Sequence, residues 1–123
     1  MSDNVYLGNP NLKRANTQIQ FTEEQVVEFL KCKDDPVYFA LNYIKIVSLD
    51  EGEVPFKMYP FQEKLVRRFH ENRFNICKMP RQTGKSTTCV SYLLHYALFN
   101  ANVNIAILAN KASTARDLLN RLQ

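Results

Sequence analysis

The residues best suited to chemistry lie in one short segment, Met79–Thr87, which reads Met-Pro-Arg-Gln-Thr-Gly-Lys-Ser-Thr. Its Gly-Lys-Ser core is the working end of a phosphate-binding loop of the Walker A type. Gly84 lets the backbone approach a phosphate closely, because it has no Cβ. The following N–H groups and the positive end of the next helix bind β-phosphate oxygens, Lys85 bridges the β- and γ-phosphates, and Ser86 completes the shell of a Mg²⁺ ion. The segment therefore predicts a site for ATP and Mg²⁺.

The match to the motif is imperfect at its first position. The full pattern has a glycine where this chain has Met79, and Pro80 follows. The alternative interpretation is a surface turn that happens to contain Gly-Lys-Ser. We favour the phosphate loop because the segment falls between a short apolar run and an apolar helix, the context that the binding mechanism requires.

Other side chains in and before the loop extend the predicted site. Arg81 is placed to stabilise charge that develops on a γ-phosphate, as an arginine finger supplied in cis does, and the alternative is a solvated or acid-paired loop arginine. Gln62 carries both a donor and an acceptor, so it can pair with the edge of adenine, unless it is simply an exposed glutamine of a first helical turn. Nearby aromatic rings can stack on the base. The predicted catalytic residues are Arg81 and Lys85, and the predicted nucleotide contacts are Tyr59, Phe61, Gln62, Arg81, Gln82, Thr83, Gly84, Lys85, Ser86 and Thr87, with Ser86 also the metal contact.

Secondary-structure signals around the loop indicate an α/β fold. Thr22 with Gln25 is typical of a capping box, Asp35-Pro36 of a second helix start, and Ser113 of a helix cap near the end of the chain. A parallel sheet flanked by helices follows from the order strand, helix, strand, helix, because a crossover helix returns the chain in the same direction. We expect helices over 22–33, 36–44, from 59, over 85–100 and from 113, and strands over 44–49, 74–79 and 103–109, with an acidic turn at 50–53.

The chain divides into three predicted parts. Residues 1–20 are polar and read as an extended arm, residues 21–58 form a helical lead-in, and residues 59–123 form the first part of a P-loop ATPase domain. The parallel sheet would contain only the strands 74–79 and 103–109, and a two-stranded parallel sheet leaves faces of the sheet and of its helices without partners. We therefore expect an incomplete domain.

Charge is distributed unevenly along the chain. Residues 1–58 hold six Lys/Arg and nine Asp/Glu, a balance of −3, whereas residues 59–123 hold ten and three, a balance of +7. This basic half favours a polyanionic partner, although solvated helix faces explain it equally well.

Neither a membrane span nor a signal peptide is expected, so we predict a cytoplasmic protein. Three cysteines without a CxxC spacing predict reduced, mostly buried thiols rather than disulfides or metal ligands.

Several segments together resemble the large terminase subunit of tailed bacteriophages, in its T-even-like myovirus form. The loop Pro80-Arg-Gln-Thr-Gly-Lys-Ser-Thr87 is similar to that family's deviant Walker A motif, which also lacks the first glycine. Tyr59-Pro-Phe-Gln62 resembles its adenine-binding motif. The remaining similarity lies in Asn11-Leu-Lys-Arg-Ala-Asn16, Asp34-Asp-Pro-Val-Tyr-Phe-Ala40 and Ile105-Ala-Ile-Leu-Ala-Asn-Lys111.

The resemblance implies the N-terminal ATP-binding portion of an ATP-driven motor that packages double-stranded DNA into proheads. It also implies a separate C-terminal nuclease domain, a small terminase subunit and a portal protein as partners, and the cytoplasm of an infected bacterial host as location. After the loop the chain offers only Asp117 as an acid, so a Walker B acid and a catalytic glutamate are missing. We therefore expect this part to need its C-terminal remainder and to be inactive alone.

Three other interpretations compete with a motor fragment. The front of a superfamily-2 helicase also places a glutamine motif before a phosphate loop, but such loops usually keep Gly or Ala at the first position. A non-catalytic nucleotide- or DNA-binding module would use the basic half as its footprint. The third is a non-functional remnant without a stable core.

Overall fold

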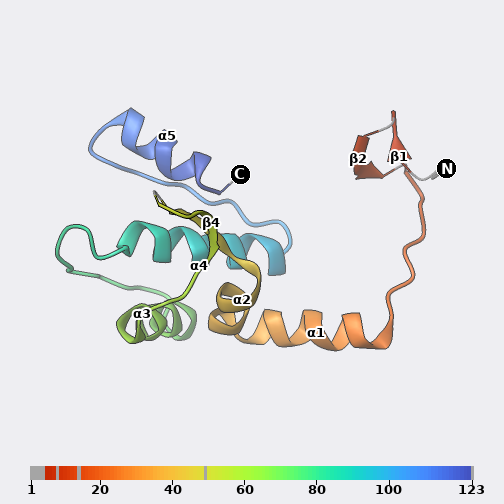
Figure 1. Cartoon of the computed structure of the whole chain (residues 1–123), viewed down its shortest axis with the longest axis horizontal. Coiled ribbons are helices and arrows are strands. Elements are labelled where there is room, and N and C mark those ends of the chain that lie inside the picture. The colour runs from red at the N-terminus through yellow and green to blue at the C-terminus, as the bar shows by residue number, and fades with distance from the viewer. Residues whose placement is uncertain (1–4, 8, 14, 49, 123) are drawn as a thin grey trace.

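The computed structural model describes residues 5–7, 9–13, 15–48 and 50–122. Residues 1–4, 8 and 14 of the predicted arm, Leu49 of a predicted strand and Gln123 lie outside the described residues. Helices dominate the part that is described, and the strands form two separate antiparallel hairpins (Figure 1). The elements are β1 (Val5–Tyr6), β2 (Asn9–Lys13), α1 (Glu23–Asp34), α2 (Pro36–Tyr43), β3 (Lys45–Ser48), β4 (Gly52–Pro55), α3 (Pro60–Glu71), α4 (Lys85–Phe99) and α5 (Ala112–Asn120).

The starts of α1 and α2 confirm the predicted caps. Thr22 Oγ1 accepts from the Gln25 backbone N–H at 3.3 Å, and Gln25 Oε1 accepts from the Thr22 N–H at 3.1 Å, which completes the capping box. Asp35 Oδ1 accepts from the N–H groups of the next helix, at 3.0 and 3.2 Å, and proline occupies the first helical position. These bonds satisfy backbone donors that a helix cannot satisfy within itself, so the two helices begin where the sequence predicted.

The hydrophobic core lies where α1, α2, α3 and α4 meet. Val66 on α3 is fully buried, and Ala40 on α2 is nearly so. The core joins the predicted lead-in to the part that carries the phosphate loop, since α2 packs against both α3 and α4. Its buried members are Cys32, Val37, Phe39, Ala40, Ile44, Phe56, Met58 and Val66.

The predicted parallel sheet is wrong for the described part of the chain. Residues 74–79 and 103–109 are extended but belong to no strand, and the two sheets that the structure does contain are antiparallel. A strand needs a neighbour for its backbone hydrogen bonds, and among the described residues neither segment has one. Their apolar side chains also lie in solvent: Phe74 is 84% exposed and Ile76 is 101% exposed.

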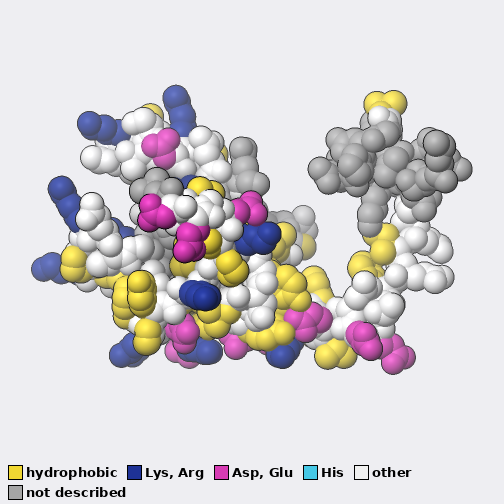
Figure 2. Space-filling view, in the orientation of Figure 1, with side chains coloured by type: hydrophobic (Ala, Val, Ile, Leu, Met, Phe, Trp, Pro, Cys, Tyr) yellow, Lys and Arg dark blue, Asp and Glu magenta, His cyan; other side chains and the backbone are white. Residues whose placement is uncertain are grey.

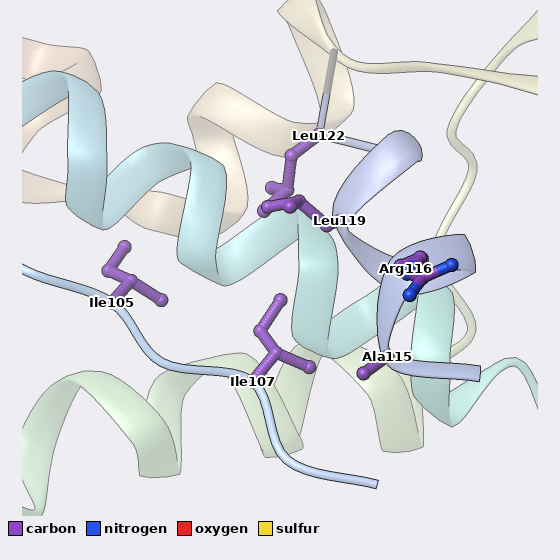
Figure 3. Close-up of a pocket in the computed structure, with 6 residues that line it drawn as sticks. All are labelled: Ile105, Ile107, Ala115, Arg116, Leu119 and Leu122. Carbon is purple, nitrogen blue, oxygen red and sulfur yellow. The ribbon is translucent and has the colours of Figure 1, made fainter. Parts of the chain in front are cut away.

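Smaller corrections concern the two ends and the hairpin. Lys111, not Ser113, is the N-cap residue of α5, and no side-chain bond caps that helix. The predicted arm contains the β1–β2 hairpin, and the predicted acidic turn is partly strand, since β4 begins at Gly52 and pairs with β3. Figure 3 shows Ile105 and Ile107 directed toward α5, where a mainly apolar pocket of about 220 Å³ is lined by Ile105, Ile107, Ala115, Arg116, Leu119 and Leu122.

Candidate phosphate-binding site

The loop before α4 is closed by bonds to its own carbonyl groups. Pro80 O accepts from Thr83 Oγ1 at 3.1 Å, and the chain turns through positive φ at Gln82 (58°) and at Gly84 (71°). Met79, where the motif has glycine, is not among the described residues with positive φ. The missing glycine is therefore not required by the backbone here, and the departure from the motif costs no strain at that position.

Gly84 directs the N-terminus of α4 into this loop. It is the N-cap residue in the left-handed conformation, no side chain caps the helix, and its first turn contains no acidic residue. The first N–H groups of α4 consequently have no capping acceptor from the described side chains, and the helix dipole adds partial positive charge at the same point. Such a helix start attracts an anion.

Lys85 adds a full positive charge at the first helical position. Its ammonium donates to Met79 O and to Pro80 O, each at 3.4 Å, so the side chain folds back along the loop. Both contacts are long for hydrogen bonds, and Lys85 is only half-buried. The ammonium can therefore exchange these carbonyl groups for phosphate oxygens at little cost.

Gln62 joins the start of α3 to the loop through both ends of its amide, and its predicted adenine contact stays a prediction. Its Oε1 accepts from the Tyr59 N–H at 2.9 Å, and its Nε2 donates to Thr83 O at 3.4 Å. The residue is only 3% exposed, so the alternative of an exposed first-turn glutamine is wrong. The spacing Tyr59-x-x-Gln62 repeats that of Thr22-x-x-Gln25, a signal that could have predicted the first of these bonds.

The aromatic rings of Tyr59 and Phe61, which precede Gln62 in the sequence, are exposed to solvent. Tyr59 and Phe61 stack with ring centroids 5.8 Å apart and planes inclined by 6°. They are 65% and 45% exposed, respectively. Exposed, nearly parallel rings offer a face to a planar base, and this stacking role stays a prediction.

The remaining predicted residues lie on the loop and on the first turn of α4. Arg81 and Gln82 are exposed in the turn, and Ser86 and Thr87 are half-buried at the helix start. Ser86 offers a Mg²⁺ ion one hydroxyl oxygen. No group of three or more His, Cys, Asp and Glu side chains that could hold a metal occurs in the described ranges. The donor set fits Mg²⁺ only as a companion of nucleotide phosphates, which is a common way of binding this ion.

Thr88 is a structural member of the site that the sequence argument missed. It is fully buried, its Oγ1 donates to Gly84 O at 2.9 Å, and its backbone N–H donates to the same oxygen at 2.9 Å. A threonine four residues after the helix cap is the signal, because its hydroxyl reaches the carbonyl one turn back. Thr88 therefore anchors the carbonyl of the residue on which the loop turns.

Two of the three cysteines are held in the protonated form by their surroundings. All three are free, with Cys32 buried, Cys89 half-buried and Cys77 exposed. Burial raises the pKa of Cys32 and that of Cys89, which keeps both thiols protonated at neutral pH. The prediction of reduced thiols agrees with this arrangement, but the expected burial fails for Cys77.

Positive charge surrounds the end of the molecule that carries the loop. Figure 2 shows Lys and Arg side chains around this end and over α5.

Among the described helices none is long and apolar enough to cross a membrane. No protein-family model matches the chain. The terminase resemblance consequently stays a prediction from the quoted motifs.

Proposed function

We propose that residues 80–87 bind the triphosphate of ATP together with Mg²⁺, as the ATP-binding part of a DNA-packaging motor of the terminase type. One observation carries the binding claim. Gly84, in the left-handed conformation, directs the uncapped N-terminus of α4 into a closed loop, and Lys85 extends along that loop from the first helical position. A surface turn that contained Gly-Lys-Ser by chance would not be expected to combine a left-handed glycine, an uncapped helix N-terminus and a lysine extended along the loop.

Each residue would act on the phosphates through a contact that its position allows. The N–H groups at the start of α4 would donate to non-bridging oxygens, and Lys85 would leave Met79 O and Pro80 O to donate to the β- and γ-phosphates. Ser86 would give its hydroxyl oxygen to Mg²⁺. Arg81, exposed in the same turn, would donate to the γ-phosphate.

Equilibrium titration with Mg-ATP tests the binding claim. Lys85→Ala should weaken binding about 10- to 100-fold, the value of one or more charge-assisted hydrogen bonds. Lys111→Ala is the matched control, because this lysine also lies at a helix start, that of α5, but is not part of residues 80–87. Equal affinities of the wild type and Lys85→Ala for Mg-ATP would contradict the proposed phosphate site.

The motor assignment rests on the resemblance and on the basic half of the chain. A balance of +7 over residues 59–123 supports contact with the phosphates of double-stranded DNA. DNA binding should then weaken steeply with salt. Salt-independent binding, or none at low salt, would contradict a DNA-facing role. The small terminase subunit and the portal protein would be further partners by the same resemblance.

We expect this chain alone to bind ATP without turning it over. After the loop only Asp117 carries a carboxylate, and it lies on α5 rather than in the loop. Hydrolysis needs an acid for Mg²⁺ and a base for water, which this arrangement does not supply. Steady hydrolysis by the purified chain that Lys85→Ala abolishes would contradict this expectation.

A further inference from the structure

Two cysteines flank the phosphate loop, Cys77 in the extended segment before it and Cys89 on α4 after it. Both are free thiols, of which Cys77 is exposed and Cys89 is half-buried. The loop between them brings the chain back on itself, because Lys85 on the first turn of α4 reaches the carbonyl oxygens of Met79 and Pro80. The segment that enters the loop therefore lies beside the start of α4, and each of these two elements carries one thiol.

The two elements carry their cysteines back from the loop by about the same distance. Cys77 comes two residues before Met79 in an extended segment, which spans about 6.6 Å at about 3.3 Å a residue. Cys89 comes four residues after Lys85 in the helix, which spans about 6 Å at about 1.5 Å a residue. The i, i+4 spacing also places Cys89 on the same face of α4 as Lys85. The two thiols therefore continue the contact between Lys85 and Met79 by one step along both elements.

The directions of the side chains agree with this register. Ile76 is 101% exposed, so its side chain points into solvent. Side chains alternate along an extended segment, so the next residue, Cys77, points to the other side, as the half-buried Met79 does. Burial is the main cause that raises the pKa of Cys89, and the charge of Cys77 raises it further, as a nearby negative charge does.

We propose that Cys77 and Cys89 are a redox modification site, at which a disulfide closes a ring around the whole phosphate loop and clamps the loop in its anion-binding shape. The oxidant is a low-molecular-weight disulfide such as oxidised glutathione. The thiolate of the exposed Cys77 attacks one of its sulfur atoms, which forms a mixed disulfide and releases one glutathione thiolate. The Cys89 thiolate then attacks the Cys77 sulfur and releases the second. Two electrons pass from the protein to the reagent, and the two thiol protons end on two glutathione molecules.

The effect of the clamp on ligand binding rests on the proposed function of the loop. Residues 80–84 turn through positive φ at Gln82 and Gly84, and Arg81 and Gln82 are exposed. Ordering such a loop around a triphosphate costs conformational entropy, and a disulfide that orders the loop beforehand removes part of this cost. The oxidised chain should therefore bind Mg-tripolyphosphate about 3- to 10-fold more tightly than the reduced chain, the ordering cost of about one side chain.

Peptide mass spectrometry after equilibration in glutathione buffers tests the pairing on the unchanged chain. Trypsin cuts between the two cysteines, so only a disulfide joins residues 74–78 to residues 86–111. This linked peptide should be the main oxidised product of the monomer, while the buried Cys32 stays a thiol. In concentrated urea, half conversion should need at least about tenfold more oxidised glutathione, because the fold no longer holds the thiols together. An equal midpoint in urea, or a glutathione adduct on Cys77 without the linked peptide, would overturn the proposal.

Titration of the oxidised and reduced chains with Mg-tripolyphosphate tests the clamp. Cys77→Ala and Cys89→Ala cannot close the ring, so their affinities should be the same in oxidising and reducing buffers. Cys32→Ala is the matched control and should keep the gain of the wild type on oxidation. Equal affinities of the oxidised and reduced wild type would overturn the clamp.

Hydrogen exchange gives a readout that needs neither a variant nor a ligand. Oxidation should slow exchange of the Thr83 and Gly84 amides, which lie inside the ring, and unchanged exchange at both would also overturn the clamp. Failure of the proposed function is distinguishable. It would appear as no binding of tripolyphosphate in either redox state, whereas the linked peptide and the slowed exchange would still support the disulfide.

Discussion

Gly84→Ala is the substitution whose cost the structure defines most closely. Gly84 has φ +71°, and a Cβ added there would stand 2.6 Å from Gln62 Nε2. Gly52, in the turn between β3 and β4, has φ +72° with no atom within 4 Å of its Cβ position. The two glycines therefore share one backbone conformation, and only Gly84 has a neighbour in the way.

The expected costs follow from this difference. Alanine in the left-handed conformation costs about 1–2 kcal/mol at either site. At Gly84 the Gln62 amide must also move, which breaks its bond to Thr83 O and strains its bond to the Tyr59 N–H. Those losses add about 1–3 kcal/mol, because the amide is buried and finds no water in exchange.

Urea unfolding followed by circular dichroism measures both free energies of unfolding. The effect of alanine on the unfolded chain is the same at the two glycines and cancels in the comparison. Gln62→Ala removes the obstructing nitrogen, so in that background Gly84→Ala should cost no more than Gly52→Ala costs in the wild type. Equal costs for Gly84→Ala and Gly52→Ala in the wild type would refute the reasoning, and so would an undiminished Gly84→Ala cost beside Gln62→Ala.

Three further predictions concern the helical part of the molecule. Asp35→Ala should lower the free energy of unfolding by about 1–2 kcal/mol, because it removes the side-chain cap of α2. Asp34→Ala, at the C-terminal end of α1, should be neutral or slightly stabilising. Equal effects of the two substitutions in urea unfolding would contradict the role of Asp35 as a cap. Burial lowers the pKa of His95, so the unfolded chain binds more protons and stability should fall as pH drops below about 6.5. His95→Gln should flatten this dependence in thermal unfolding at several pH values, and an unchanged dependence would contradict the reasoning. A hydrogen bond to the Glu28 carboxylate on α1 raises the pKa of Tyr43 to about 12. Tyr43→Phe should therefore remove the most alkaline tyrosine step from an ultraviolet absorbance titration. A highest tyrosine step near pH 10 in the wild type would contradict that hydrogen bond.

Local signals predicted the helices because the residues that start a helix act on their immediate neighbours. Thr22 with Gln25, and Asp35 with the proline after it, bond to backbone groups two or three residues away. Such bonds depend on spacing alone. The start of α4 at Lys85 was predictable for the same reason, since Gly84 supplies the left-handed conformation that the turn requires.

Pairing of strands was not predictable from the same information. An apolar run such as 103–109 shows that a segment can be buried between layers, but it does not show which backbone lies beside it. Here neither that run nor 74–79 pairs with a strand in the described part of the chain, and the run lies beside α5 (Figure 3). Leu108 is consequently 89% exposed, although its neighbours predicted a buried strand. The inference from apolar composition to a parallel sheet lacked the partner that a sheet requires.

The loop was predicted from residue types, but the roles of its supporting residues depended on distances that the sequence does not contain. Gln62 and Thr83 are 21 residues apart, and only the packing of α3 against α4 brings the amide to the carbonyl. A glutamine amide carries both donors and an acceptor, so the residue type alone suits a base contact and a backbone contact alike. Both ends of the Gln62 amide lie against backbone groups at Tyr59 and Thr83, and the predicted adenine contact stays a prediction.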